Sequence, residues 1–203
     1  DLCVVPEHDG LEAQAGVLLT RGVLNRVRPP KTKTPGTSLI AVGGPSRHHD
    51  WLGAEIVAQV KAIIAASESG QKWNLTNSRR TPEPTWQALK ALASEQVTCL
   101  DWRQLDSGWL VSTLEQSETA WVSEDSVSMI YEALSAGAGV GLLSVPRRNA
   151  GRVVKGVTLL ISDRSITTFG CWQSGAMLRP MTPALDESAR VACWIENQWL
   201  KIA

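Results

Sequence analysis

Short, nearly all-apolar runs alternate with longer amphipathic stretches along most of this chain. The run "SLIAVGG" (38–44) is rich in branched residues and ends in two glycines, which favours a buried strand over a helix. The stretch after it repeats apolar residues at helical spacing from Ile56 to Ile64, with Asp50 as the expected N-cap and Gly70 as the stop. This region is therefore predicted to form a strand followed by a helix.

The same alternation continues towards the C-terminus. Further strands are expected at 72–78, 97–102, 119–123 and 139–145. Further helices are expected at 81–94, at 126–136 and from about Asp186 onward. Apolar strands separated by helices predict a parallel sheet whose two faces are both covered. The expected fold class is α/β, a Rossmann-like parallel sheet with helices on both faces.

The first 37 residues have a different character. Two short strand-like pieces, "LCVVPE" and "GVLLTRG", precede a connector rich in Pro and Lys, "RVRPPKTKTPGTS". The chain opens on an apolar run without a methionine. We therefore expect residues 1–37 to be interdomain strands and a linker from a truncated N-terminal domain, and residues 38–203 to be a second domain.

Charge and cysteine content limit the class of partner and compartment. Lysine plus arginine balances aspartate plus glutamate at 20 each, so no global field favours nucleic acid, and any anion site must be local. The four cysteines form no CxxC pair, which predicts reduced, buried thiols and no metal site. No apolar run approaches the roughly 20 residues of a membrane helix. We expect a cytoplasmic protein whose only membrane contact would be peripheral, through the missing part.

Ligands of open parallel sheets bind beyond the carboxyl ends of the strands, so the loops that follow strands are the first candidates. In "VGGPSRHHDW" (42–51), Gly43 and Gly44 would let backbone N–H groups approach an anion, with Ser46 and Arg47 close behind. The alternative is a tight turn with a solvated basic tip. The adjacent histidines lack the spacing of a metal site.

A second loop, "LTNSRRTP" (75–82), also follows an expected strand. Thr76 and Ser78 are polar residues at the strand end, and Arg79 or Arg80 would grip a phosphate. The alternative is a pair of solvated arginines.

The third candidate lies in "TAWVSEDSVSMIYEALSAG" (119–137). With Asp125 or Ser126 as the helix cap, Ser128 and Glu132 fall on one polar face. Helical side chains lean towards the N-terminus, so the Glu132 carboxylate would point back to the crevice and suit the two hydroxyls of a ribose. Free N–H groups at the helix start suit a phosphate. The alternative is a solvated acidic face with a capping acid.

Two of these segments resemble parts of known glycosyltransferases. Seven residues separate Glu124 from Glu132, as in the donor-binding helix of GT-B enzymes, and the Gly43–Gly44 loop is similar to the glycine turn of the peptidoglycan N-acetylglucosaminyltransferase. Six motifs occur in the same order as in the mitochondrial-fission "elongated mitochondria" family: "VVPEHDGL", "LLTRGVLNRV", "VGGPSRHHDW", "TNSRRTP", "SEDSVSMIYEALSAG" and "LDESARVA".

The resemblance implies the C-terminal, donor-binding-type domain of a GT-B protein that takes a UDP- or GDP-type nucleotide sugar without a cofactor or metal. It places Gly43, Gly44 and Ser46 at the diphosphate, Ser126 and Ser128 at the helix N-terminus, Glu132 on the ribose and Glu124 near the sugar. Arg79 and Arg80 would offset the charge of the leaving nucleotide. If the protein is an enzyme, the general base would come from the N-terminal domain, and this fragment alone would be inactive.

Two alternatives remain open. Plant members of that family are linked to recruitment of a dynamin-related protein, which implies a non-enzymatic adaptor scaffold. Such an adaptor would expose an apolar patch, for which Trp102, Trp109, Trp172 and Trp194 are candidates. A nucleotide-sugar epimerase-like enzyme is disfavoured because no GxGxxG follows a strand and Tyr131 is followed by Ser135 instead of the lysine of a Tyr-xxx-Lys pair.

Overall fold

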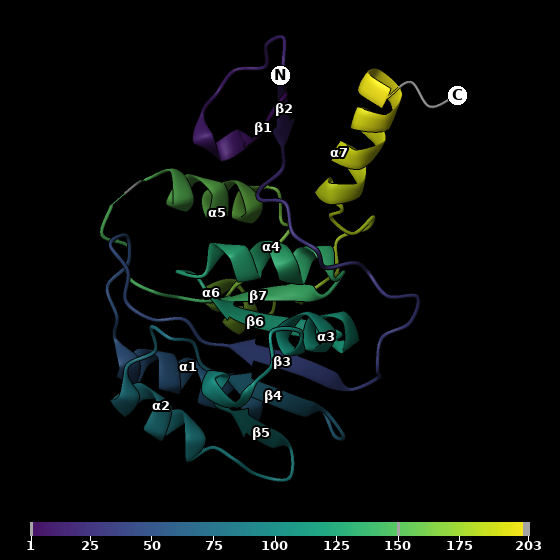
Figure 1. Ribbon diagram of the computed structural model, residues 1–203. Coiled ribbons are helices and arrows are strands. Elements are labelled where there is room, and N and C mark those ends of the chain that lie inside the picture. The colour runs from purple at the N-terminus through teal and green to yellow at the C-terminus, as the bar shows by residue number, and fades with distance from the viewer. Residues whose placement is uncertain (1, 150, 201–203) are drawn as a thin grey trace.

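A six-stranded sheet forms the centre of the computed structural model, which describes residues 2–149 and 151–200 (Figure 1). Its strands lie in the order β5-β4-β3-β6-β7-β8, and each neighbouring pair is parallel. The strands are β3 (Thr37–Ala41), β4 (Lys72–Thr76), β5 (Val97–Leu100), β6 (Thr119–Ser123), β7 (Gly139–Leu143) and β8 (Thr167–Thr168). The parallel sheet predicted from the apolar runs is confirmed.

Helices cover both faces of this sheet. One face packs against α1 (Gly53–Ala65), α2 (Glu83–Lys90) and α6 (Phe169–Gln173), and the other against α3 (Trp109–Gln116), α4 (Val127–Ser135) and α5 (Arg152–Ser162). Along β3 and just beyond it the side chains alternate: Leu39 and Ala41 join one buried cluster, and Ile40 and Val42 the other. The α/β, Rossmann-like fold class is therefore confirmed.

The order of the strands reverses beside β3. The chain runs from β3 outward to β4 and β5 and then returns to place β6 on the other side of β3. The carboxyl ends of β3 and β6 consequently flank a topological switch point, where open α/β sheets bind their ligands.

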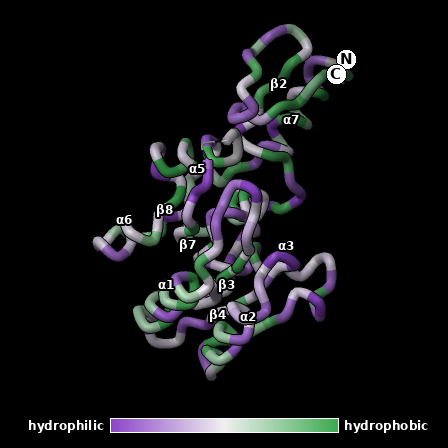
Figure 2. The backbone as a smooth tube through the Cα atoms, turned by 90° about the vertical axis from the view of Figure 1, so that its left-hand side faces the viewer, coloured by the Kyte–Doolittle hydropathy of each residue, from purple (hydrophilic) through white to green (hydrophobic). Residues whose placement is uncertain are grey.

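A small N-terminal unit lies apart from the main sheet. Strands β1 (Cys3–Pro6) and β2 (Val17–Thr20), joined through the 3-10 helix Glu7–Asp9, form a two-stranded parallel sheet. Figures 1 and 2 both place it beyond α5 and beside α7 (Glu187–Ile195), which a short π-helix, Glu196–Leu200, extends. The two strand-like pieces are confirmed, whereas the division of the chain near residue 37 stays a prediction.

The expected start of the first helix was wrong. Helix α1 begins at Gly53 and not at Asp50, because the Asp50 N–H donates to the Pro146 carbonyl at 2.8 Å and its carboxylate pairs with Arg148 at 2.6 Å. Both contacts hold Asp50 in the loop. At the other end of the chain, Asp186 caps α7 as expected and accepts from the Ala189 N–H at 2.9 Å.

The expectation that all four cysteines are buried was also wrong. Cys99 is partly buried, and Cys3, Cys171 and Cys193 are exposed. The exposed three lie in the N-terminal unit, α6 and α7, at the margins of the molecule. Among the helices described, none is long and apolar enough to cross a membrane.

Candidate functional site

The loops that follow β3, β4 and β6 meet at the switch point and enclose a cleft of about 380 Å³. Small-molecule sites have volumes of roughly 300–1,000 Å³, so the cleft is large enough for part of a ligand. Its lining residues are Ser46, His48, His49, Ser78, Arg80, Asp125, Ser126, Val127, Ser128 and Met129. All three loops singled out from the sequence contribute to it.

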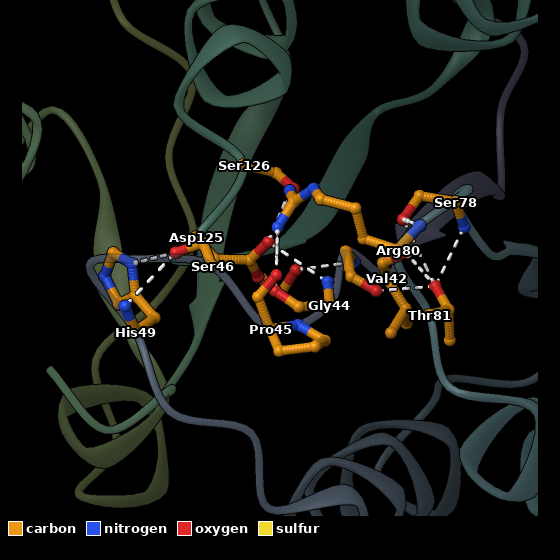
Figure 3. A network of polar contacts seen from close by, with 12 residues as sticks. Val42, Gly44, Pro45, Ser46, His49, Ser78, Arg80, Thr81, Asp125 and Ser126 are labelled. Carbon is orange, nitrogen blue, oxygen red and sulfur yellow. Dashed lines mark hydrogen bonds and ion pairs between the residues drawn. The ribbon is translucent and has the colours of Figure 1, made fainter. Parts of the chain in front are cut away.

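Arg80 ties the three loops together. Its guanidinium reaches from the loop after β4 to the Gly44 carbonyl at 2.7 Å and to Asp125 at 2.6 Å, and it donates to the Ser126 hydroxyl at 3.1 Å (Figure 3). In the same loop, the Thr81 hydroxyl donates to the Val42 carbonyl at 3.0 Å. Arg80 is therefore engaged with protein acceptors and not with solvent alone.

Asp125 occupies the anion-binding position of the glycine loop. One of its carboxylate oxygens accepts from the Gly44 N–H at 3.1 Å and from the Ser126 hydroxyl at 3.2 Å, while Gly43 donates to the Ser123 hydroxyl at 2.7 Å. A Cβ on residue 43 would lie 2.2 Å from Asp125, so only glycine permits this approach. The two amides expected to hold a diphosphate are thus used within the protein.

His49 also lines the cleft, although the sequence suggested for it only a positive charge beside the glycine loop or a solvated basic tip. The Ser46 hydroxyl oxygen accepts from the backbone N–H groups of His48 and His49, at 3.2 and 3.1 Å, and lies 3.4 Å from His49 Nδ1. Burial lowers the pKa of His49, although the negative charges of Glu124 and Asp125 act to raise it. The imidazole is therefore neutral at pH 7.

Glu124 lies beside the cleft but does not line it. The carboxylate is buried and pairs with Arg147, in the loop after β7. That loop also forms an antiparallel bridge between Arg147 and His49. Nothing in the sequence pairs Arg147 with Glu124, because the basic run after the strand expected at 139–145 does not indicate a partner.

The first turn of helix α4 lines the cleft. Ser126 is its N-cap, without a capping side-chain bond, and Ser128 is exposed to the cleft. Glu132 lies one turn beyond Ser128, half-buried, and outside the cleft lining. Burial raises the pKa of Glu132, and the Arg26 guanidinium opposes this.

The structure thus separates the candidate residues into two groups. It brings together Ser46, Ser78, Arg80, Asp125, Ser126 and Ser128 around the cleft, with Gly43 and Gly44 behind Asp125. It leaves Arg47, Thr76, Arg79, Glu124 and Glu132 outside the lining. Of these, Thr76 is buried and donates to the Leu100 carbonyl at 2.9 Å, and Arg47 donates to His48 Nε2 at 2.9 Å.

The tryptophans expected to form an exposed apolar patch do not gather in one place. Trp102 is exposed, whereas Trp172 packs against Trp121, with ring centroids 5.4 Å apart at an interplanar angle of 79°. Trp109 and Trp194 are partly buried on different helices.

Residues 1–199 match the family model described as Mitochondrial fission ELM1. The chain belongs to the Mitochondrial fission ELM1 family. The match covers every loop of the cleft, and the parallel sheet with helices on both faces is a Rossmann-like α/β fold. No protein of curated function matches the chain.

Among solved structures, one similar protein is described as a UDP-N-acetylglucosamine 2-epimerase from Listeria monocytogenes. The two structures compare with a TM-score of 0.47 and 14% sequence identity, over 83% of this chain. The chain spans 47% of that protein's length. A likeness of this size carries no argument about function.

Proposed function

We propose that this domain binds a nucleotide-diphosphate sugar of UDP or GDP type in the cleft between β3 and β6. The observation that carries the proposal is the position of the cleft: it lies at the switch point of a parallel sheet, against the N-terminus of α4. The first N–H groups of a helix have no partner within it and attract phosphate. Ser128 adds a hydroxyl at the same place.

The nucleotide then extends along α4 in this proposal. Ser128 and Glu132 are four residues apart and share one face of the helix. A ligand whose phosphates contact the start of α4 therefore has its ribose within reach of the Glu132 carboxylate. Such a carboxylate accepts hydrogen bonds from both ribose hydroxyls.

The charges that hold the phosphates come from the protein and require no metal. Arg80 lines the cleft, and the exposed Arg79 follows the same strand. As part of a glycosyltransferase, these groups would stabilise the nucleotide leaving group. The adaptor function remains the competing proposal, and it predicts a cleft that binds no nucleotide.

Calorimetric titration with UDP-N-acetylglucosamine, UDP-glucose and GDP-mannose tests the proposal. We expect saturable binding of one nucleotide class, weakened about tenfold or more by Glu132→Gln because two charge-assisted hydrogen bonds are lost. Glu55→Gln, which removes an exposed carboxylate on α1, is the matched control and should bind as the wild type does. Absence of binding to all three sugars would contradict the proposal and favour an adaptor.

A further inference from the structure

The described residues that line the cleft carry no net charge. Arg80 and Asp125 form an ion pair at 2.6 Å and cancel one another. Burial lowers the pKa of His49, which disfavours a positive charge on its imidazole, and His48 Nε2 lies 2.9 Å from Arg47 Nε. The remaining lining residues are serines and two apolar residues. The cleft is therefore not the strongly basic pocket that its arginine suggests.

Asp125 places a carboxylate in the wall of this cleft. Its side chain has no exposed surface, and three protein donors hold one carboxylate oxygen: the Gly44 N–H, Arg80 and the Ser126 hydroxyl. Its other oxygen is buried and has no hydrogen-bond partner within the described part of the chain. The available donors are thus already shared with a resident carboxylate, one of whose oxygens has no donor within the described part of the chain.

The neighbouring acid does not add to this field. Glu124 pairs with Arg147, as Asp125 does with Arg80, but it lies outside the lining. Apart from Arg80, the positive potential offered to a ligand by the lining is that of the α4 N-terminus, equivalent to about half an elementary charge. Removing a doubly charged phosphate from water costs more than removing a singly charged one, and the described lining offers no unpaired cation to offset the difference.

We propose that Asp125 makes the cleft select capped phosphates, each with a single negative charge, over the terminal phosphate of a free nucleoside diphosphate. A terminal phosphate carries about −1.5 to −2 charges at pH 7. In a nucleotide sugar both phosphates are diesters and remain monoanionic. This inference rests on the proposed function, and it makes Asp125 the residue that favours the intact donor over the nucleoside diphosphate that remains after sugar transfer.

The test compares two ligands that differ in this charge and by a single methyl group. UDP and its β-methyl ester, or the GDP pair if the sugar titration selects guanine, are titrated into the wild-type chain at pH 7.5. We expect the ester to bind about tenfold or more tightly than UDP. Asp125→Asn, which keeps an acceptor for the Gly44 N–H, should bring the two affinities within about twofold by strengthening the binding of UDP. Glu55→Gln, which removes an exposed carboxylate on α1 outside the cleft lining, is the control and should keep the wild-type ratio.

Each outcome decides between the two proposals. Equal affinity of the wild type for UDP and its ester overturns the role of Asp125 while leaving nucleotide binding intact. An unchanged ratio in a folded Asp125→Asn variant overturns it as well. Should that variant fail to fold, the wild-type comparison still decides. If neither ligand nor any nucleotide sugar binds, the proposed function itself fails.

Discussion

Glu132 is a single residue whose charge works against the stability of the ligand-free fold. Burial raises the pKa of its carboxyl above the ordinary 4.5, and Arg26 compensates this in part. The folded state then binds the proton more tightly than the unfolded state. Stability is consequently greatest below the unfolded pKa and falls as the pH rises through the folded pKa.

We therefore expect Glu132→Gln to unfold at a higher temperature than the wild type at pH 7. The gain should vanish at about pH 3.5, where the carboxyl is protonated in both states. Thermal unfolding at the two pH values measures this, and Glu55→Gln, on the exposed face of α1, should show no gain at either. A less stable Glu132→Gln at pH 7 would show that the carboxylate makes stabilising contacts. A charge that costs stability in the absence of ligand is typical of a binding residue.

At the scale of elements, Lys33 joins the connector to the ends of two helices. Its ammonium donates to the Ser117 and Ala136 carbonyls at 2.7 and 2.9 Å, beyond the last residues of α3 and α4, and to Glu115 at 3.4 Å. Burial lowers the pKa of this lysine, although Glu118 and Glu115 oppose the shift. The favourable contacts with helix C-termini offset that cost.

Removal of this ammonium should loosen both helix ends. Lys33→Met keeps the apolar stem but leaves the carbonyls without their donor, and we expect a loss of about 1–3 kcal/mol in the free energy of unfolding. Urea denaturation measures it. Lys31→Met, two residues away and exposed, should stay within about 0.5 kcal/mol of the wild type. Equal effects of the two variants would mean that the Lys33 hydrogen bonds contribute nothing.

The elements that the sequence predicted are those with a strong local pattern. Residues 39–42 alternate between two cores and were recognisable as a buried strand. Helices α3 and α5 were missed, as were β8 and α6. In α5, the interior Gly156 and several β-branched residues give low helix propensity. Tertiary packing forms that helix: Val157 and Leu160 are buried, and a Cβ on residue 156 would lie 3.1 Å from the His8 ring.

The candidate site was predicted loop by loop but not contact by contact. Fold-class reasoning places the loops after parallel strands at one edge, so Ser46, Arg80 and Ser126 were found. It cannot show that Asp125, in the loop after β6, accepts a hydrogen bond from the Gly44 N–H, in the loop after β3. That bond depends on how closely the two loops approach each other across the switch point. The same holds for His49, because its burial and its lowered pKa depend on how the loops pack around it.

On the scale of the whole molecule, Glu187 attaches the N-terminal unit to α7. Its carboxylate accepts from the Arg21 N–H at 2.9 Å and from Arg190, which also contacts the Leu19 carbonyl at 2.5 Å. Burial would raise the pKa of Glu187, but the hydrogen bonds from Arg190 and Arg21 outweigh it and lower the pKa below 4.5. The stability that Glu187 contributes is fully present above the pKa of the unfolded state and is lost as the pH falls through the pKa of the folded state.

Glu187→Gln at pH 7 should therefore weaken the contact between the N-terminal unit and α7, as acid does in the wild type. We expect faster hydrogen exchange of the backbone N–H groups in β1 and β2, with β3 and β6 unchanged, because the main sheet has its own buried core. Glu12→Gln, which removes an exposed carboxylate within the N-terminal unit, is the control and should leave exchange as in the wild type. Equal protection in Glu187→Gln and wild type would mean that other contacts, among them the Arg21–Asp163 pair and packing against α5, hold the unit in place. Faster exchange in all strands would instead mean that the N-terminal unit and the main sheet unfold as one cooperative body.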